Sequence, residues 1–150
     1  MPDLTAAAQN KKEDMKMQKE ITVEAKVENL QKVLEFVDSG LEAAGCGMKV
    51  QIQVDVALEE MYVNIANYAY APGTGTATIA FESGEKRIKI TLKDSGTPYD
   101  PLAHEDPDIT LSAEEREIGG LGIFLVKKNM DAVSYEYRDG KNIFVMEKEL

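Results

Sequence analysis

The sequence predicts one α/β domain built as a two-layer sandwich, in which about five strands form a mixed, mostly antiparallel sheet with three helices on one face. Two observations predict these elements. Apolar residues recur at steps of three and four in three stretches, and apolar and polar residues alternate in others. A length of 150 residues is typical of one compact domain. We expect that domain to occupy residues 19–150, after a loose polar tail over residues 1–18.

Five stretches are rich in β-branched or alternating residues and predict strands. They cover residues 20–25, 76–81, 87–92, 132–137 and 142–148. The second and third stretches form a predicted hairpin, and so do the fourth and fifth. The last hairpin turns at Asp139-Gly140, which is a favoured two-residue turn.

Three stretches have the apolar periodicity of helices, over residues 27–44, 54–70 and 123–130. Gly45 suits the left-handed turn that ends the first helix, and Pro72 ends the second.

A polar row lies beside the apolar face of the second helix. Glu60, Asn64 and Asn67 follow the i, i+4, i+7 spacing, so the row is expected at the margin of the core. An amide oxygen there can bind a hard cation such as Mg²⁺, and a carboxylate can take a proton from a hydroxyl. The polar edge of an ordinary amphipathic helix is the alternative.

The strand over residues 87–92 carries Asp94 onto its apolar side, together with Ile90 and Leu92. An unpaired carboxylate in that position costs several kcal/mol. Asp94 therefore needs a donor that the sequence does not obviously supply, or it lies just beyond the strand end in water. A ligand with an amino group would supply the donor.

Residues 97–118 form an acidic stretch with no clear period, which is typical of an active-site lid or of a disordered connection. Gly119, Gly120 and Gly122 follow it and precede the third helix. Glycines at that point let the backbone approach a phosphate, which the free N–H groups and the positive end of the helix dipole attract. A simple tight turn is the alternative.

Charge and composition exclude several classes of protein. The net charge is −10 and the basic residues are scattered among carboxylates, which argues against a nucleic-acid partner. Cys46 is the only cysteine, so no intrachain disulfide forms, and no apolar run resembles a signal peptide or reaches membrane-spanning length. We expect a cytoplasmic protein without a membrane segment.

Three motifs occur in a characteristic order: Glu60-Met-Tyr-Val-Asn64 on a helix, Asp94-Ser-Gly96 at a strand end, and Gly120-Leu-Gly122 before a helix. This arrangement resembles the ATP-binding domain of the GHKL superfamily, the Bergerat fold, and within it the small stand-alone anti-sigma factor serine/threonine kinases. The resemblance covers nearly everything after Glu20. The run GGLGIFLVKKNMDAVSYEYRDGKN is the segment most similar to that family.

The resemblance implies a role for each residue of the site. Asn64 would hold Mg²⁺ between the phosphates of ATP, and Glu60 would orient or deprotonate the attacking hydroxyl. Asp94 would accept a hydrogen bond from the adenine amino group, and Gly96 would give the base room. The other residues implied to bind the nucleotide are Asn67, Pro98, Gly119, Gly120, Leu121 and Gly122.

Contacts of Arg116 or Lys127 with the γ-phosphate are a further implication. The sequence departs from the family pattern in two places. Tyr68 stands where family members often carry His, and Pro98 stands where they often carry a second glycine. The first departure affects the positioning of Mg²⁺ or water, and the second stiffens the entry to the lid.

The function implied is an ATP- and Mg²⁺-dependent serine/threonine kinase that phosphorylates an anti-sigma-factor antagonist, a STAS-type protein, and sequesters a sigma factor. A homodimer is also implied. The alternative is a nucleotide-binding switch that regulates partner proteins and transfers nothing. Glu60 favours the enzyme, because a pure switch does not need it. The catalytic domain of a histidine kinase is disfavoured, since the sequence has no room for a dimerising histidine-bearing helix pair.

Overall fold

The computed structural model describes residues 15–103 and 120–150. Its sheet consists of β1 (Met15–Glu24), β2 (Thr76–Gly84), β3 (Arg87–Asp94), β4 (Ala132–Arg138) and β5 (Lys141–Glu149). The strand order is β1-β2-β3-β5-β4, and each neighbouring pair is antiparallel. The predicted sheet is thus confirmed, in a purely antiparallel form among the described strands.

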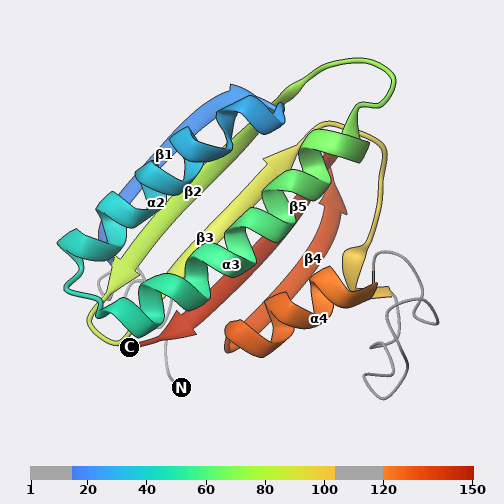
Figure 1. The fold of residues 1–150 in the computed structure, drawn as a ribbon. Coiled ribbons are helices and arrows are strands. Elements are labelled where there is room, and N and C mark those ends of the chain that lie inside the picture. Colours follow the sequence, from blue (N-terminus) through green and yellow to red (C-terminus); the bar gives the residue numbers. More distant parts are fainter. Residues whose placement is uncertain (1–14, 104–119) are drawn as a thin grey trace, which may run out of the picture.

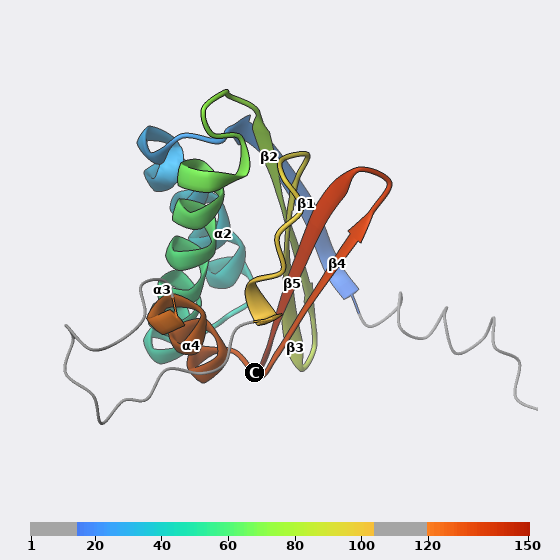
Figure 2. The same ribbon diagram turned by 90° about the vertical axis from the view of Figure 1, so that its right-hand side faces the viewer.

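The helices are α2 (Leu30–Ala43), α3 (Met48–Asn64) and α4 (Gly120–Asn129), with short 3₁₀ turns at Val27–Asn29 and Pro101–Ala103. All three helices lie over one face of the sheet (Figure 1). The view turned by 90° shows the helices and the sheet as separate layers (Figure 2). The predicted two-layer architecture is therefore confirmed.

The core lies between these layers, because alternate residues of the strands face the helices. Ile79 and Phe81 of β2 are fully buried, as are Ile90 of β3 and Leu58 of α3. A Cβ atom added to Gly40 of α2 would lie 2.6 Å from the ring of Phe81, so the glycine allows α2 to approach the sheet closely. This packing fixes the positions of α3 and β3, which carry most of the predicted site.

Several element boundaries differ from the prediction. β1 begins at Met15, so residues 15–18 belong to a strand and only residues 1–14 of the predicted tail lie outside the described residues. The second half of this strand was predicted, over residues 20–25, but its first half was missed because it lies at the edge of the sheet and is mostly polar. Lys19 is part of it, and its Nζ donates to the backbone oxygen of Phe36 at 3.1 Å.

α3 begins at Met48, earlier than predicted. The prediction missed its first turns because Met48 and Ile52 are 72% and 55% exposed and interrupt the amphipathic pattern. Its other end also differs from the prediction. The α-helix ends at Asn64 and continues as a π-helical turn, Ile65–Ala69. π-Helical turns occur frequently at functional sites. Here the carbonyl oxygen of Ala69 accepts a hydrogen bond from the N–H of Thr97 at 2.8 Å, which ties the end of the helix to the chain after β3.

A pair of carboxyl groups lies between α2 and α3. The Oδ1 atoms of Asp38 and Asp55 are both buried, and neither has a hydrogen-bond partner in the described structure. A proton held between the two groups would supply the missing hydrogen bond. Burial, together with the hydrogen bond and the charge of Asp38 and the charge of Glu59, raises the pKa of Asp55 to about 8. The pair therefore holds a proton at neutral pH.

This pair predicts how stability depends on pH. An unfolded chain loses the proton of an aspartic acid near pH 4, whereas folded Asp55 keeps it to about pH 8. Unfolding then releases a proton between these values, so the free energy of unfolding falls as the pH rises from 5 to 8. Asp55→Asn should remove most of this decline, because the amide is neutral and can donate to Asp38. We expect it to stabilise the protein at pH 8 by about 2 kcal/mol.

Urea unfolding at pH 5 and pH 8 measures both effects. Glu42→Gln, which removes an exposed carboxylate of α2, is the matched control and should keep the pH dependence of the unmodified protein. An Asp55→Asn variant whose stability declines as steeply as that of the control would contradict the assignment.

Candidate functional site

Two adjoining cavities lie beside α3. The larger has a volume of about 680 Å³ and is bordered by α3, α4 and the segment after β3. The smaller has a volume of about 190 Å³ and reaches inward to β3, β4 and β5. Both cavities are lined by Met61, Asn64, Tyr68, Tyr99 and Pro101. These shared residues mark the junction through which one extended ligand could occupy both.

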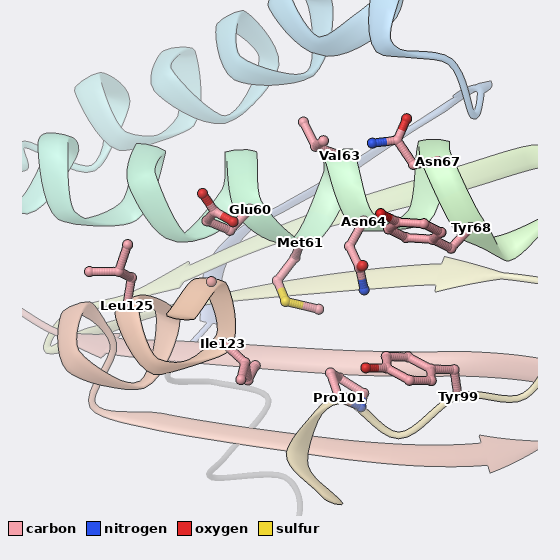
Figure 3. A pocket seen from close by; sticks show the side chains of 11 residues that line it. Glu60, Met61, Val63, Asn64, Asn67, Tyr68, Tyr99, Pro101, Ile123 and Leu125 are labelled. Atoms are coloured by element: carbon pink, nitrogen blue, oxygen red, sulfur yellow. The ribbon is translucent and has the colours of Figure 1, made fainter. Parts of the chain in front are cut away.

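The polar row predicted on the second helix forms one wall of the larger cavity. Glu60, Asn64 and Asn67 all line it, and Figure 3 shows Asn64 pointing from α3 toward the segment that carries Tyr99. Glu60 and Asn67 are exposed, whereas Asn64 is half-buried. The amide of Asn64 has no hydrogen-bond partner within the described residues. It is therefore available to a ligand or a hydrated cation at the junction of the cavities.

The start of α4 faces Glu60. The helix begins at Gly120, three residues before the predicted start, so Gly120, Leu121 and Gly122 form its first turn. N–H groups in a first turn have no partner within the helix and favour a nearby anion. Gly122 lines the larger cavity, and a Cβ atom added to it would lie 2.6 Å from Oε2 of Glu60. The predicted glycine motif and the predicted base are thus brought together, while Gly119 lies outside the described residues.

Asp94 lies at the wall of the smaller cavity and is 6% exposed. The alternative that it extends into water is therefore wrong. Its Oδ1 accepts hydrogen bonds from the N–H of Gly96 and from Nδ2 of Asn142, both at 2.9 Å. No hydrogen bond to Oδ2 comes from the described part of the chain. Since Leu92 and Phe144 line the same cavity, a flat apolar ring that carries an amino group suits it.

Asn142 lines the smaller cavity and was not singled out by the sequence analysis. It is 7% exposed on β5 and lies opposite Asp94 in the pairing of β3 with β5. The alternation in this strand already indicated that Asn142 faces the core, because Asn142 lies on the same face as Phe144 and Met146, which are buried. What the sequence did not show is that β5 pairs with β3 in this register.

The remaining predicted residues have mixed positions. Pro98 lines the smaller cavity, but Gly96 lines neither. A Cβ atom added to Gly96 would lie 2.2 Å from the carbonyl oxygen of Ala69. The structure therefore gives a different reason for this glycine from the predicted one: it allows the chain after β3 to pass the π-helical turn.

The predicted lid is described only in part. Residues 97–103 border the cavities, whereas residues 104–118, with Arg116 among them, lie outside the described residues. Lys127 is exposed in the last turn of α4 and lines neither cavity. The described residues that line the larger cavity include no lysine or arginine. A polyphosphate held there would depend on the helix start and on a bound cation for charge neutralisation.

Comparisons with known proteins identify a family and a shared fold. The profile of the histidine kinase-like ATPase domain matches residues 23–148. The chain is 27% identical over 95 residues to the serine/threonine-protein kinase BtrW of Bordetella bronchiseptica, and the aligned region covers 63% of this chain and 67% of that protein. It is 26% identical over 116 residues to the serine-protein kinase RsbW of Listeria monocytogenes, and the aligned region covers 71% of this chain and 74% of that protein.

A solved structure shows the same fold. The crystal structure of the RsbU and RsbW domains of a Mycobacterium tuberculosis protein superimposes with a TM-score of 0.61 at 12% identity. The match covers 88% of this chain and 31% of that longer chain. At this identity the likeness concerns the fold alone.

The close approach at Gly96 predicts a loss of stability on substitution. Gly96→Ser should lower the free energy of unfolding by about 1–3 kcal/mol, because the added Cβ atom meets a backbone carbonyl that cannot rotate away. Gly47→Ser is the matched control, since no atom lies within 4 Å of a Cβ atom there and serine suits the start of α3. Urea unfolding of both variants provides the measurement. If the two variants have equal free energies of unfolding, the backbone at Gly96 does not pass as close to Ala69 as described.

Proposed function

The chain belongs to the family of histidine kinase-like ATPase domains, and we propose that it is an ATP- and Mg²⁺-dependent serine/threonine protein kinase. One observation carries the proposal: two cavities meet at Asn64, with Asp94 in the smaller one and Glu60, next to the glycine-rich start of α4, in the larger one. The kinases among its relatives support the same reaction class.

The adenine ring is proposed to occupy the smaller cavity. Its amino group donates to Oδ2 of Asp94, while Leu92 and Phe144 contact the ring. The phosphates then extend past the shared residues into the larger cavity, toward the first turn of α4. This orientation is supported because the smaller cavity contains the carboxylate of Asp94, whose Oδ2 accepts no hydrogen bond from the described residues, and the larger cavity contains the helix start that favours an anion.

Asn64 is the residue proposed to hold Mg²⁺, together with phosphate oxygens of the nucleotide. Its half-buried amide, which has no partner in the described structure, fits a hard cation that prefers oxygen ligands. The described residues contain no group of three or more His, Cys, Asp or Glu side chains that could hold a metal ion. When bound, Mg²⁺ would neutralise charge on the phosphates.

Glu60 is the proposed catalytic residue. A Ser or Thr hydroxyl oxygen of the protein substrate forms a bond to the γ-phosphorus, and the bond from that phosphorus to the β–γ bridging oxygen breaks, so that ADP leaves. The hydroxyl proton passes to the carboxylate of Glu60. The exposed position of Glu60 in the larger cavity supports this role, because a side chain from a second protein can approach it.

We propose an anti-sigma-factor antagonist of the STAS type as the protein substrate and a sigma factor as the sequestered partner. A homodimer in the cytoplasm completes the proposal. Support comes from the resemblance of the three motifs to the anti-sigma factor kinases and from relatives named as serine kinases. Over the described parts of the chain, none of the helices is long and apolar enough to cross a membrane.

Nucleotide binding predicts a ligand-dependent gain in stability. ATP with Mg²⁺ should raise the thermal midpoint progressively, and at one hundred times its Kd it should add about 2.7 kcal/mol to the free energy of unfolding. Asn64→Ala should weaken the effect of ATP with Mg²⁺ at least about tenfold in concentration, because it removes a ligand of the cation. A thermal-shift titration with and without EDTA measures this dependence. If the ATP-induced rise in the thermal midpoint is unchanged both by EDTA and by Asn64→Ala, the proposed role of Asn64 in holding Mg²⁺ is contradicted.

Removing the proposed base predicts a separation of binding from transfer. Glu60→Gln should lower phosphoryl transfer by about 100-fold or more while ATP affinity stays within about threefold. Glu59→Gln, an exposed neighbour on α3 that lines neither cavity, is the control and should retain transfer. The assay follows label from the γ-phosphate of ATP onto STAS-type antagonist proteins.

Two outcomes of this assay would contradict the proposal in different ways. Transfer that survives in Glu60→Gln would reject Glu60 as the base. An unmodified protein that binds ATP but labels no antagonist would favour the nucleotide-binding switch.

A further inference from the structure

The side chain of Asn142 is the meeting point of the strands and the chain segment around the smaller cavity. Its Nδ2 donates to Oδ1 of Asp94 at 2.9 Å and to the backbone oxygen of Thr97 at 3.0 Å. Its Oδ1 accepts from the N–H of Tyr99 at 3.2 Å and from the hydroxyl of Tyr135. One buried amide thereby connects β3, β4, β5 and the segment that follows β3.

The surrounding groups fix the orientation of this amide. A backbone N–H can only donate, and a carboxylate or a carbonyl oxygen can only accept. If the amide were turned over, its oxygen would face the oxygens of Asp94 and Thr97, and its NH₂ group would face the N–H of Tyr99. The orientation with Nδ2 toward Asp94 is therefore strongly preferred.

This orientation determines what Asp94 can offer a ligand. The N–H of Gly96 and Nδ2 of Asn142 both bind Oδ1, so rotation of the carboxylate would cost both hydrogen bonds. Oδ2 receives no hydrogen bond from the described part of the chain and remains as an acceptor. The carboxylate is thus held with one oxygen committed to the protein and the other available in the smaller cavity.

The same amide also acts on the junction of the cavities. Tyr99 lines both cavities, and Figure 3 shows its ring on the side opposite Tyr68. Because Asn142 holds the backbone of Thr97 and Tyr99, the path of this segment depends on the same side chain that orients Asp94.

We propose that Asn142 is a positioning residue for base recognition: its amide aims Oδ2 of Asp94 at the amino group of the bound base, and the hydroxyl of Tyr135 helps to hold that amide in place by donating to its oxygen. The inference rests on the proposed function, in which the smaller cavity binds adenine. It goes further by assigning discrimination at position 6 of the purine to a residue that acts through Asp94.

The test compares ATP with purine riboside triphosphate, which lacks the 6-amino group, each titrated calorimetrically with Mg²⁺. The unmodified protein should bind ATP at least about tenfold more tightly, as expected for one hydrogen bond to a charged group. Asn142→Asp replaces the donor with an acceptor of the same shape. It should reduce the preference for ATP to less than about threefold, and it should weaken ATP binding far more than binding of the analogue.

Tyr135→Phe provides a second variant that keeps the buried amide. It removes one of the two hydrogen bonds to the amide oxygen, so the amide is held less firmly and the preference for ATP should fall by a smaller factor. Tyr137→Phe is the matched control on β4, since Tyr137 is 48% exposed and lines neither cavity, and it should leave the preference unchanged. Circular dichroism without nucleotide shows whether each variant is folded. If Asn142→Asp does not fold, the nucleotide preference of Tyr135→Phe is used to test the inference.

The outcomes separate the inference from the proposed function. If the folded Asn142→Asp variant loses affinity equally for both triphosphates, Asn142 has a merely structural role and the inference is overturned. If Asn142→Asp does not fold and Tyr135→Phe keeps the full preference, the inference is likewise overturned. An unmodified protein that binds both triphosphates equally would reject base recognition by Asp94, which belongs to the proposed function.

Discussion

The buried hydrogen bond between Asn142 and Asp94 is the interaction on which the site depends. A carboxylate at the end of a central strand is costly unless donors reach it. Here one oxygen is bound by the protein and the other is left to the smaller cavity. The sheet produces this hydrogen bond directly, because the pairing of β3 with β5 places Asp94 and Asn142 opposite each other. The second oxygen of Asp94, Oδ2, receives no hydrogen bond from the described part of the chain and is therefore available to recognise a ligand.

The helical layer contributes the other half of the site. α3 carries Glu60 and Asn64 on one wall, and the first turn of α4 approaches so closely that a Cβ atom on Gly122 would lie 2.6 Å from Oε2 of Glu60. The π-helical turn after Asn64 is tied to the segment after β3 through Ala69 and Thr97. The distance between the smaller and the larger cavity is therefore set by packed elements on both sides, which suits catalysis that relies on positioning.

Much of this could be predicted because some patterns are strictly local. The alternation in β3 was sufficient to predict that Asp94 turns inward, and helical spacing was sufficient to group Glu60 with Asn64. Features that depend on tertiary pairing could not be predicted. Asn142 gains its position from a strand far away in the sequence, and the requirement for glycine at Gly96 comes from the backbone of Ala69. The first half of β1 is a mostly polar edge segment that becomes recognisable as a strand only through its pairing with β2.

A crystal structure with a non-hydrolysable ATP analogue and Mg²⁺ tests the central claim most directly. The account predicts that the adenine amino group lies about 2.9 Å from Oδ2 of Asp94, the usual length of such a hydrogen bond, with the phosphates beside Asn64 and the start of α4. A base bound outside the smaller cavity, or one whose amino group points away from Asp94, would contradict it.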